Sequence, residues 1–239
     1  MAYLNVLHDG VFQPMASEEY VDNAISGITP STGGSAYFTV TGKPFGFNGK
    51  TALFFGDSIC EGHTGHGITQ NNYVKNFSEH VGLTATNRGQ GGACFSYTYN
   101  GIPSIVDKIK ATTLDKDFVF IEGGINDWQT GATATQLETA LEDLGQYLTA
   151  NCTVPVIIIT PINHGGWGGG QTKNMTVQQV RTIMSKMALK YGFDLVLGEN
   201  FNFPSDSSDP LVSILYGDRL HPSEAGYKLY AKGLETALC

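Results

Sequence analysis

Short apolar runs alternate with helix-like stretches from residue 51 onward, and this alternation constrains the fold more than any other feature. The runs are rich in β-branched and aromatic residues, as strands buried inside a sheet usually are. Strands separated by helices form parallel sheets with right-handed crossovers. We therefore predict an α/β fold, a three-layer α/β/α flavodoxin-like sheet of about five parallel strands. The predicted strands are residues 52–55, 83–86, 118–122, 154–160 and 194–197.

Helices are expected between these strands, where apolar residues recur with a helical period. Their ends carry recognisable signals, such as a Thr followed three residues later by Glu or Gln, or a glycine after the last turn. The predicted helices are about 71–81, closed by Gly82; about 102–111; one that begins with Thr135 and Glu138; one that begins with Thr176 and Gln179; and one from about Ser223.

The first part of the chain has a different pattern. Residues 3–7 and 36–40 favour strands, turn-rich stretches separate them, and no strong helical period is present. We predict a small β-rich N-terminal extension over residues 1–48 and a main domain over residues 49–239. The extension can pack on the main domain, mediate homo-oligomerisation or join this chain to a larger protein.

Composition and charge exclude several classes of partner. Apolar residues make up 41% of the chain, enough for a folded core, and the net charge is −8. An acidic chain is a poor match for nucleic acid or for an anionic membrane surface. The sequence shows no apolar run long enough to span a bilayer and no visible secretory signal. These features favour a cytoplasmic location or a place in a larger or virion-borne assembly.

The cysteines and loop histidines give no metal-binding pattern. The cysteines are Cys60, Cys94, Cys152 and Cys239. None forms a CxxC pair, which disfavours a structural zinc site. Cys60 and Cys94 can pair in a disulfide or remain buried thiols, and we favour the thiols. We interpret His63, His66 and His164 as solvated loop residues, and we predict neither a metal nor a cofactor.

Polar and glycine-rich segments follow the predicted strands. Residues 56–58 follow the first strand, 89–92 the second and 124–127 the third, while Asp218 and His221 come after the fifth. The carboxyl ends of parallel strands face one crevice, so these segments should converge there. Taken alone, a serine in this position is equally compatible with a cap on the next helix.

Together these segments supply the groups that a serine hydrolase needs. Ser58 is the candidate nucleophile, His221 the general base and Asp218 the acid that orients the imidazole. The candidate oxyanion donors are the backbone amides of Ser58 and Gly92 and the side-chain amide of Asn126. We predict a carboxylic ester hydrolase that acts through an acyl-enzyme.

Four spaced motifs occur in order over about residues 51–238. They are Gly-Asp-Ser at 56–58, Asn-x-Gly-x-x-Gly at 87–92, Gly-x-Asn-Asp at 124–127 and Asp-x-x-His-Pro at 218–222. This set resembles the SGNH hydrolase superfamily, also called GDSL-type esterases/lipases. The resemblance implies the roles given above to Ser58, Gly92, Asn126, Asp218 and His221, with Gly89 as a second candidate for the oxyanion glycine.

The substrate class is argued from the loops around the predicted site. They are rich in Gly, Asn, His and Trp, and no apolar lid helix is evident. This favours a small acyl group, acetyl, on a carbohydrate. The candidate substrate-binding residues are Asp57, Gly89, Tyr97, His164 and Trp167. The alternatives are a lipolytic esterase or thioesterase of the same superfamily, and a carbohydrate-binding or structural module of a phage-tail-like assembly.

Overall fold

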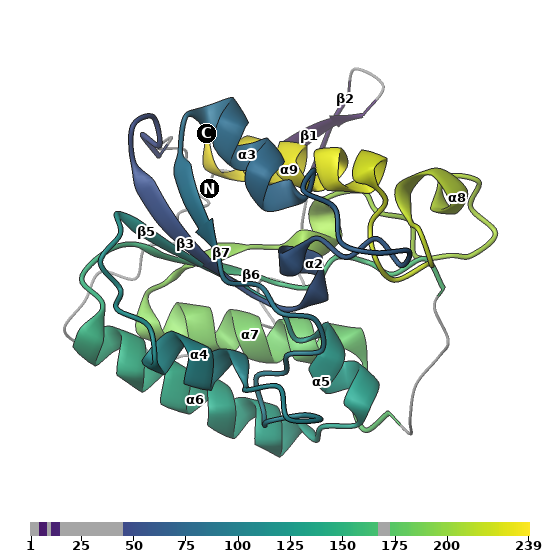
Figure 1. Cartoon of the computed structure of the whole chain (residues 1–239). Coiled ribbons are helices and arrows are strands. Elements are labelled where there is room, and N and C mark those ends of the chain that lie inside the picture. Colours follow the sequence, from purple (N-terminus) through teal and green to yellow (C-terminus); the bar gives the residue numbers. More distant parts are fainter. Residues whose placement is uncertain (1–4, 9–10, 15–44, 167–172) are drawn as a thin grey trace.

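A five-stranded sheet forms the centre of the computed structural model, which describes residues 5–8, 11–14, 45–166 and 173–239. The strands lie in the order β4, β3, β5, β6, β7, and all neighbouring pairs are parallel (Figure 1). This confirms the predicted flavodoxin-like order. The strands are β3 (Thr51–Phe55), β4 (Thr84–Asn87), β5 (Phe118–Glu122), β6 (Val156–Ile159) and β7 (Asp194–Val196).

Helices cover both faces of the sheet. In Figure 1, α3 and α9 lie over one face and α4, α6 and α7 lie over the other, which gives three layers. None of the described helices is both long enough and apolar enough to cross a bilayer. The helices that cover the sheet are α3 (Tyr73–Val81), α4 (Ile105–Lys110), α6 (Ala134–Asn151), α7 (Val177–Tyr191) and α9 (Glu224–Leu238).

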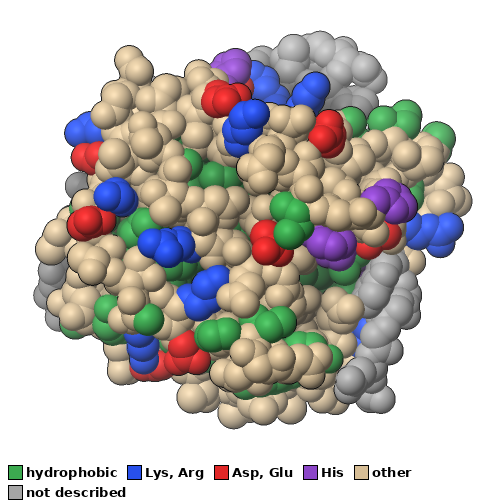
Figure 2. Space-filling view, viewed as in Figure 1, with side chains coloured by type: hydrophobic (Ala, Val, Ile, Leu, Met, Phe, Trp, Pro, Cys, Tyr) green, Lys and Arg blue, Asp and Glu red, His purple; other side chains and the backbone are tan. Residues whose placement is uncertain are grey.

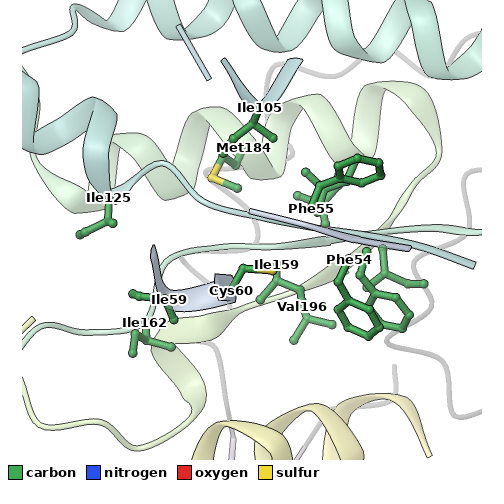
Figure 3. Close-up of a cluster of buried hydrophobic side chains, with 14 of the residues drawn as sticks. Phe54, Phe55, Ile59, Cys60, Ile105, Ile125, Ile159, Ile162, Met184 and Val196 are labelled. Carbon is green, nitrogen blue, oxygen red and sulfur yellow. The ribbon is translucent and has the colours of Figure 1, made fainter. Parts of the chain in front are cut away.

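Aromatic side chains on β3 and β5 fill the core on both sides of the sheet. Successive strand residues point to opposite faces, and Figure 3 shows Phe55 on the same side as Ile105 and Met184, with Phe54 on the other. The Phe54 ring stacks on Phe120 with centroids 4.2 Å apart. Burial of each such ring stabilises the fold by about 2–3 kcal/mol. The centre of the sheet is therefore a rigid base for the segments that follow its strands.

Several short elements lie at the carboxyl ends of the strands and were not predicted. They hold three to six residues each, too few for a periodic pattern to reveal them. They are α2 (Ser58–Glu61), α5 (Ile125–Thr130), the 3₁₀ turn η1 (Gly198–Asn200) and α8 (Val212–Leu215).

One predicted helix start is wrong. The capping box of α6 uses Thr133 and Gln136, not Thr135 and Glu138. The second predicted capping box, at Thr176 and Gln179, is present at the start of α7, and Ser223 caps α9 as predicted.

The N-terminal extension is described only in part. Strands β1 (Asn5–His8) and β2 (Val11–Pro14) pair antiparallel, with Asn5 opposite Pro14. The predicted strand at 36–40 lies outside the described residues. The division at residue 48 stays a prediction.

Candidate active site

The β3–α2 connection places Ser58 at the crevice. Strand β3 ends at Phe55, and Ser58 is the first residue of α2. Asp57 caps this helix, because its Oδ1 accepts a hydrogen bond from Ile59 N at 2.9 Å. Asp57 was predicted as a substrate-binding residue, but its side chain is fully buried and supports the turn. The serine hydroxyl is thus fixed at the point where the strand order reverses between β3 and β5.

A tight turn before α9 arranges Asp218 and His221. The Oδ1 atom of Asp218 accepts from the backbone amides of Leu220 at 3.0 Å and His221 at 2.7 Å. Its Oδ2 lies 2.8 Å from His221 Nδ1. Burial alone would raise the pKa of Asp218, but the hydrogen bonds and charge of His221 dominate and lower it to about 2. The carboxylate therefore stays ionised and acts as an acceptor toward the imidazole.

Ser58 and His221 meet although 163 positions separate them in the sequence. The distance from Ser58 Oγ to His221 Nε2 is 2.9 Å. Since Asp218 accepts at Nδ1, the proton of the neutral imidazole lies on Nδ1 and Nε2 accepts from the serine hydroxyl. In this arrangement the imidazole can take the hydroxyl proton as the serine oxygen attacks a carbonyl carbon.

Helix α5 brings a second pair of polar side chains to the crevice. Asn126 Nδ2 donates to Ala93 O at 3.0 Å, which uses one of its two hydrogens. The neighbouring carboxylate of Asp127 accepts from Phe95 N at 2.9 Å and from Ser96 N at 2.8 Å. Burial raises the pKa of Asp127, and these hydrogen bonds oppose the rise. The bonds join α5 to the segment that follows Gly92.

We expect Asp127→Asn to weaken this junction. An asparagine there must direct an NH₂ group toward one of two backbone donors, so a buried bond is lost and a donor is left unpaired. The free energy of unfolding should fall by about 3 kcal/mol, measured by urea denaturation. Asp143→Asn is the control, since it removes an exposed ion pair with Lys110 and should cost under about 1 kcal/mol. Equal losses in the two variants would contradict the assigned role of Asp127.

A family model decides the relationship of this chain to known proteins. The model of the GDSL-like Lipase/Acylhydrolase family matches residues 54–229. The chain belongs to this family. The matched range includes the α2 turn, the start of α5 and the Asp218–His221 turn. No curated protein matches the chain significantly.

Solved structures show the same fold as this GDSL-family hydrolase. A protein from Lactobacillus plantarum has a TM-score of 0.67 at 23% identity, over 79% of this chain and 96% of its own. The acetyl xylan esterase AlAXEase has a TM-score of 0.57 at 21% identity, over 79% and 100%. Axe2, an acetylxylan esterase from Geobacillus stearothermophilus, has a TM-score of 0.54 at 22% identity, over 81% and 96%. At these identities, the likeness shows the fold alone.

The other residues predicted to bind substrate in this GDSL-family chain have structural contacts. Gly89 packs so closely on α2 that a Cβ there would lie 2.3 Å from Glu61 N, and its amide donates to Asn87 Oδ1. The Tyr97 hydroxyl lies 2.6 Å from Thr130 Oγ1. Both groups make contacts within the fold, and their role in substrate binding stays a prediction.

The loop after β6 carries the remaining candidates. The half-buried ring of His164 stacks on Trp128 with centroids 4.9 Å apart. Burial lowers the pKa of His164, and the charges of Lys173 and Arg181 lower it further. The imidazole is therefore neutral and packed against Trp128. The prediction that it is a solvated loop residue is wrong. Trp167 lies outside the described residues.

His63 lies next to the candidate triad, and the sequence did not indicate this contact. Its ring packs against the His221 ring with centroids 4.5 Å apart, and its Nδ1 accepts from Gly65 N at 3.0 Å. It was predicted to be a solvated loop residue, and no local signal distinguishes it from His66. Figure 2 shows histidine and acidic side chains close together on the side where Figure 1 places α2 and α8.

Cys60 and Cys94 are both buried and free, in agreement with the favoured thiol state. Within the described ranges, no cluster of His, Cys, Asp and Glu has the arrangement of a metal site.

Proposed function

We propose that this chain is a serine esterase in which Ser58, His221 and Asp218 form the catalytic triad. The observation that carries the proposal is the continuous hydrogen-bonded path from Ser58 Oγ through the imidazole to Asp218, with steps of 2.9 and 2.8 Å. This geometry is within the range needed for proton transfer. Membership of the GDSL-like family supports the same reaction class.

The proposed reaction has two half-reactions. Ser58 Oγ bonds to the ester carbonyl carbon while its proton moves to His221 Nε2, and the carbonyl oxygen becomes an oxyanion. The intermediate collapses, the bond to the alcohol oxygen breaks, and Nε2 returns the proton to that oxygen. A water molecule then repeats the sequence on the acyl-enzyme and releases the acid. Asp218 stabilises the imidazolium in both halves.

Three donors are available for the oxyanion. They are the Ser58 amide at the start of α2, the second Asn126 Nδ2 hydrogen and the Gly92 amide. Within the described residues the Gly92 amide donates to no other group, whereas the Gly89 amide is bonded to Asn87. We therefore favour Gly92 over Gly89 as the donor.

Asn126→Ala should remove one oxyanion donor. We expect kcat to fall about 100-fold with KM nearly unchanged, because the hydrogen bond forms mainly in the transition state. Initial rates with p-nitrophenyl acetate give both constants. Asn151→Ala is the matched control, since that exposed side chain bonds only to the backbone of its own helix and should not alter kcat. A loss below about threefold in Asn126→Ala would exclude the side chain as a donor.

We propose acetyl as the acyl group and a carbohydrate as the alcohol. Two structural neighbours are named acetyl xylan esterases, and they share the fold over most of their length. The loops around Ser58 are polar, which suits a small acyl group on a hydroxylated alcohol. A lipolytic esterase or thioesterase is the alternative within the family.

A series of acyl esters beside acetylated sugars tests the substrate. We expect kcat/KM to fall steeply from acetyl to longer p-nitrophenyl esters, and acetylated xylo-oligosaccharides to release acetate. Ser58→Ala is the blank for each substrate. A rate that rises with chain length would favour the lipolytic alternative, and no turnover of any ester would favour a binding module.

A further inference from the structure

A buried acid that belongs neither to the proposed triad nor to the oxyanion donors lies next to the proposed nucleophile. Glu122 is the last residue of β5, in the middle strand of the sheet, and only 1% of its surface is exposed. Its Oε2 has no hydrogen-bond partner among the described residues, and the same is true of Asp57 Oδ2. A glutamate carboxyl in such a place is costly, and a residue of this kind needs a physical explanation.

The Glu122 carboxyl lies directly against the turn that carries Ser58. In the register of β3 and β5, Phe55 pairs with Ile121, so Gly56 comes beside Glu122. A Cβ at Gly56 would lie 2.8 Å from Glu122 Oε2 and 2.5 Å from Cys60 Cβ. The glycine is therefore required because the carboxyl and α2 already fill the space.

Core side chains close this space from the other directions. Ile159 pairs with Glu122 across β5 and β6 and so points to the same face of the sheet. Figure 3 shows Ile159 close to Cys60 of α2. A smaller side chain at position 122 would leave a cavity that only the turn or its neighbours can fill.

The surroundings favour the uncharged form of this carboxyl. Burial raises the pKa of Glu122 well above its usual value, and the nearby Asp57 carboxylate raises it further. The backbone amides of Asp57 and Cys60 act in the opposite direction without cancelling the rise. Burial also raises the pKa of Asp57, to about 6. The titratable groups whose charges act on Glu122, or on which it acts, are Asp57, Cys60, Tyr73, Tyr227 and Tyr230.

We propose that Glu122 is a positioning residue whose carboxyl supports the turn from Gly56 to Cys60 and so keeps Ser58 Oγ in reach of His221. The inference rests on the proposed function, because it takes Ser58 as the nucleophile. A neutral carboxyl can both donate and accept, and it is the right size for the space. Displacement of a reacting atom by about 1 Å can lower a rate about 100-fold.

Three variants test the proposal. Glu122→Ala should lower kcat for p-nitrophenyl acetate at least about tenfold and leave KM nearly unchanged, because the turn relaxes into the cavity. Glu122→Gln keeps the size and both hydrogen-bonding functions and should recover most of that loss. Ile121→Val, on the opposite face of the same strand, is the control for a general effect of core packing and should retain kcat.

A variant of similar size without hydrogen-bonding groups gives a readout that a general packing role would not move. Glu122→Met fills much of the same space but cannot bond to the backbone amides of Asp57 and Cys60, so its kcat should fall at least about tenfold, whereas Glu122→Gln should stay near the wild-type value. This comparison leaves no large cavity, so it stands even if Glu122→Ala does not fold. Equal kcat in Glu122→Met and Glu122→Gln, or equal kcat in Glu122→Ala and wild type, would overturn the proposal. Wild-type turnover by Ser58→Ala would instead refute the proposed function.

Discussion

Ser58→Ala should abolish ester hydrolysis. The variant lacks the oxygen that bonds to the acyl carbon, so no acyl-enzyme can form. We expect kcat for p-nitrophenyl acetate to fall about 1,000,000-fold, with the residual rate supplied by binding and the oxyanion donors. Steady-state kinetics at high enzyme concentration measure this loss.

The fold should survive the Ser58 substitution. Ser58 is a small side chain at the start of α2, and the cap of that helix is Asp57. The thermal midpoint and the near-ultraviolet circular dichroism spectrum should match those of the wild type. Ser205→Ala, at an exposed position, is the control. An undiminished rate in folded Ser58→Ala would remove Ser58 from the mechanism.

Asp218→Asn should have the next largest effect. The carboxylate accepts from His221 Nδ1, which leaves Nε2 free to take the Ser58 proton. An asparagine can direct its NH₂ group toward Nδ1 and stabilise the tautomer with the proton on Nε2. That imidazole cannot act as a base toward Ser58, and kcat should fall about 10,000-fold.

The comparison with a surface aspartate separates this effect from a loss of charge. Asp115→Asn removes an exposed carboxylate paired with Lys116 and should leave kcat unchanged. The remaining activity of Asp218→Asn should rise with pH, because hydroxide in place of the imidazole removes the proton. Retention of more than about a tenth of the wild-type kcat would show that Asp218 does not orient His221.

The strands were predictable because their signal is local. The run at 118–122 is apolar except for its last residue, and such runs recur with helical stretches between them. The start of α6 shows the limit of local evidence. Thr133 with Gln136 and Thr135 with Glu138 both have the spacing of a capping box, and only the packing of the helix selects the first pair.

The candidate triad was predictable because each member lies in a motif after a strand, and the topology brings these ends together. The contacts that support the triad could not be predicted from the sequence. The burial of Asp57, the contact between His63 and His221, and the position of Glu122 beneath Gly56 depend on the path of distant segments. A pattern of neighbouring residues does not encode such contacts.

Covalent labelling tests the central claim most directly. Diethyl p-nitrophenyl phosphate reacts with an activated serine and leaves a stable diethylphosphoryl group on its oxygen. Intact mass and peptide mapping of the inactivated protein should show one such group, on the peptide that contains Ser58, and activity should fall in proportion to labelling. Complete inactivation with the label on another residue, or full activity after Ser58 is labelled, would contradict the account.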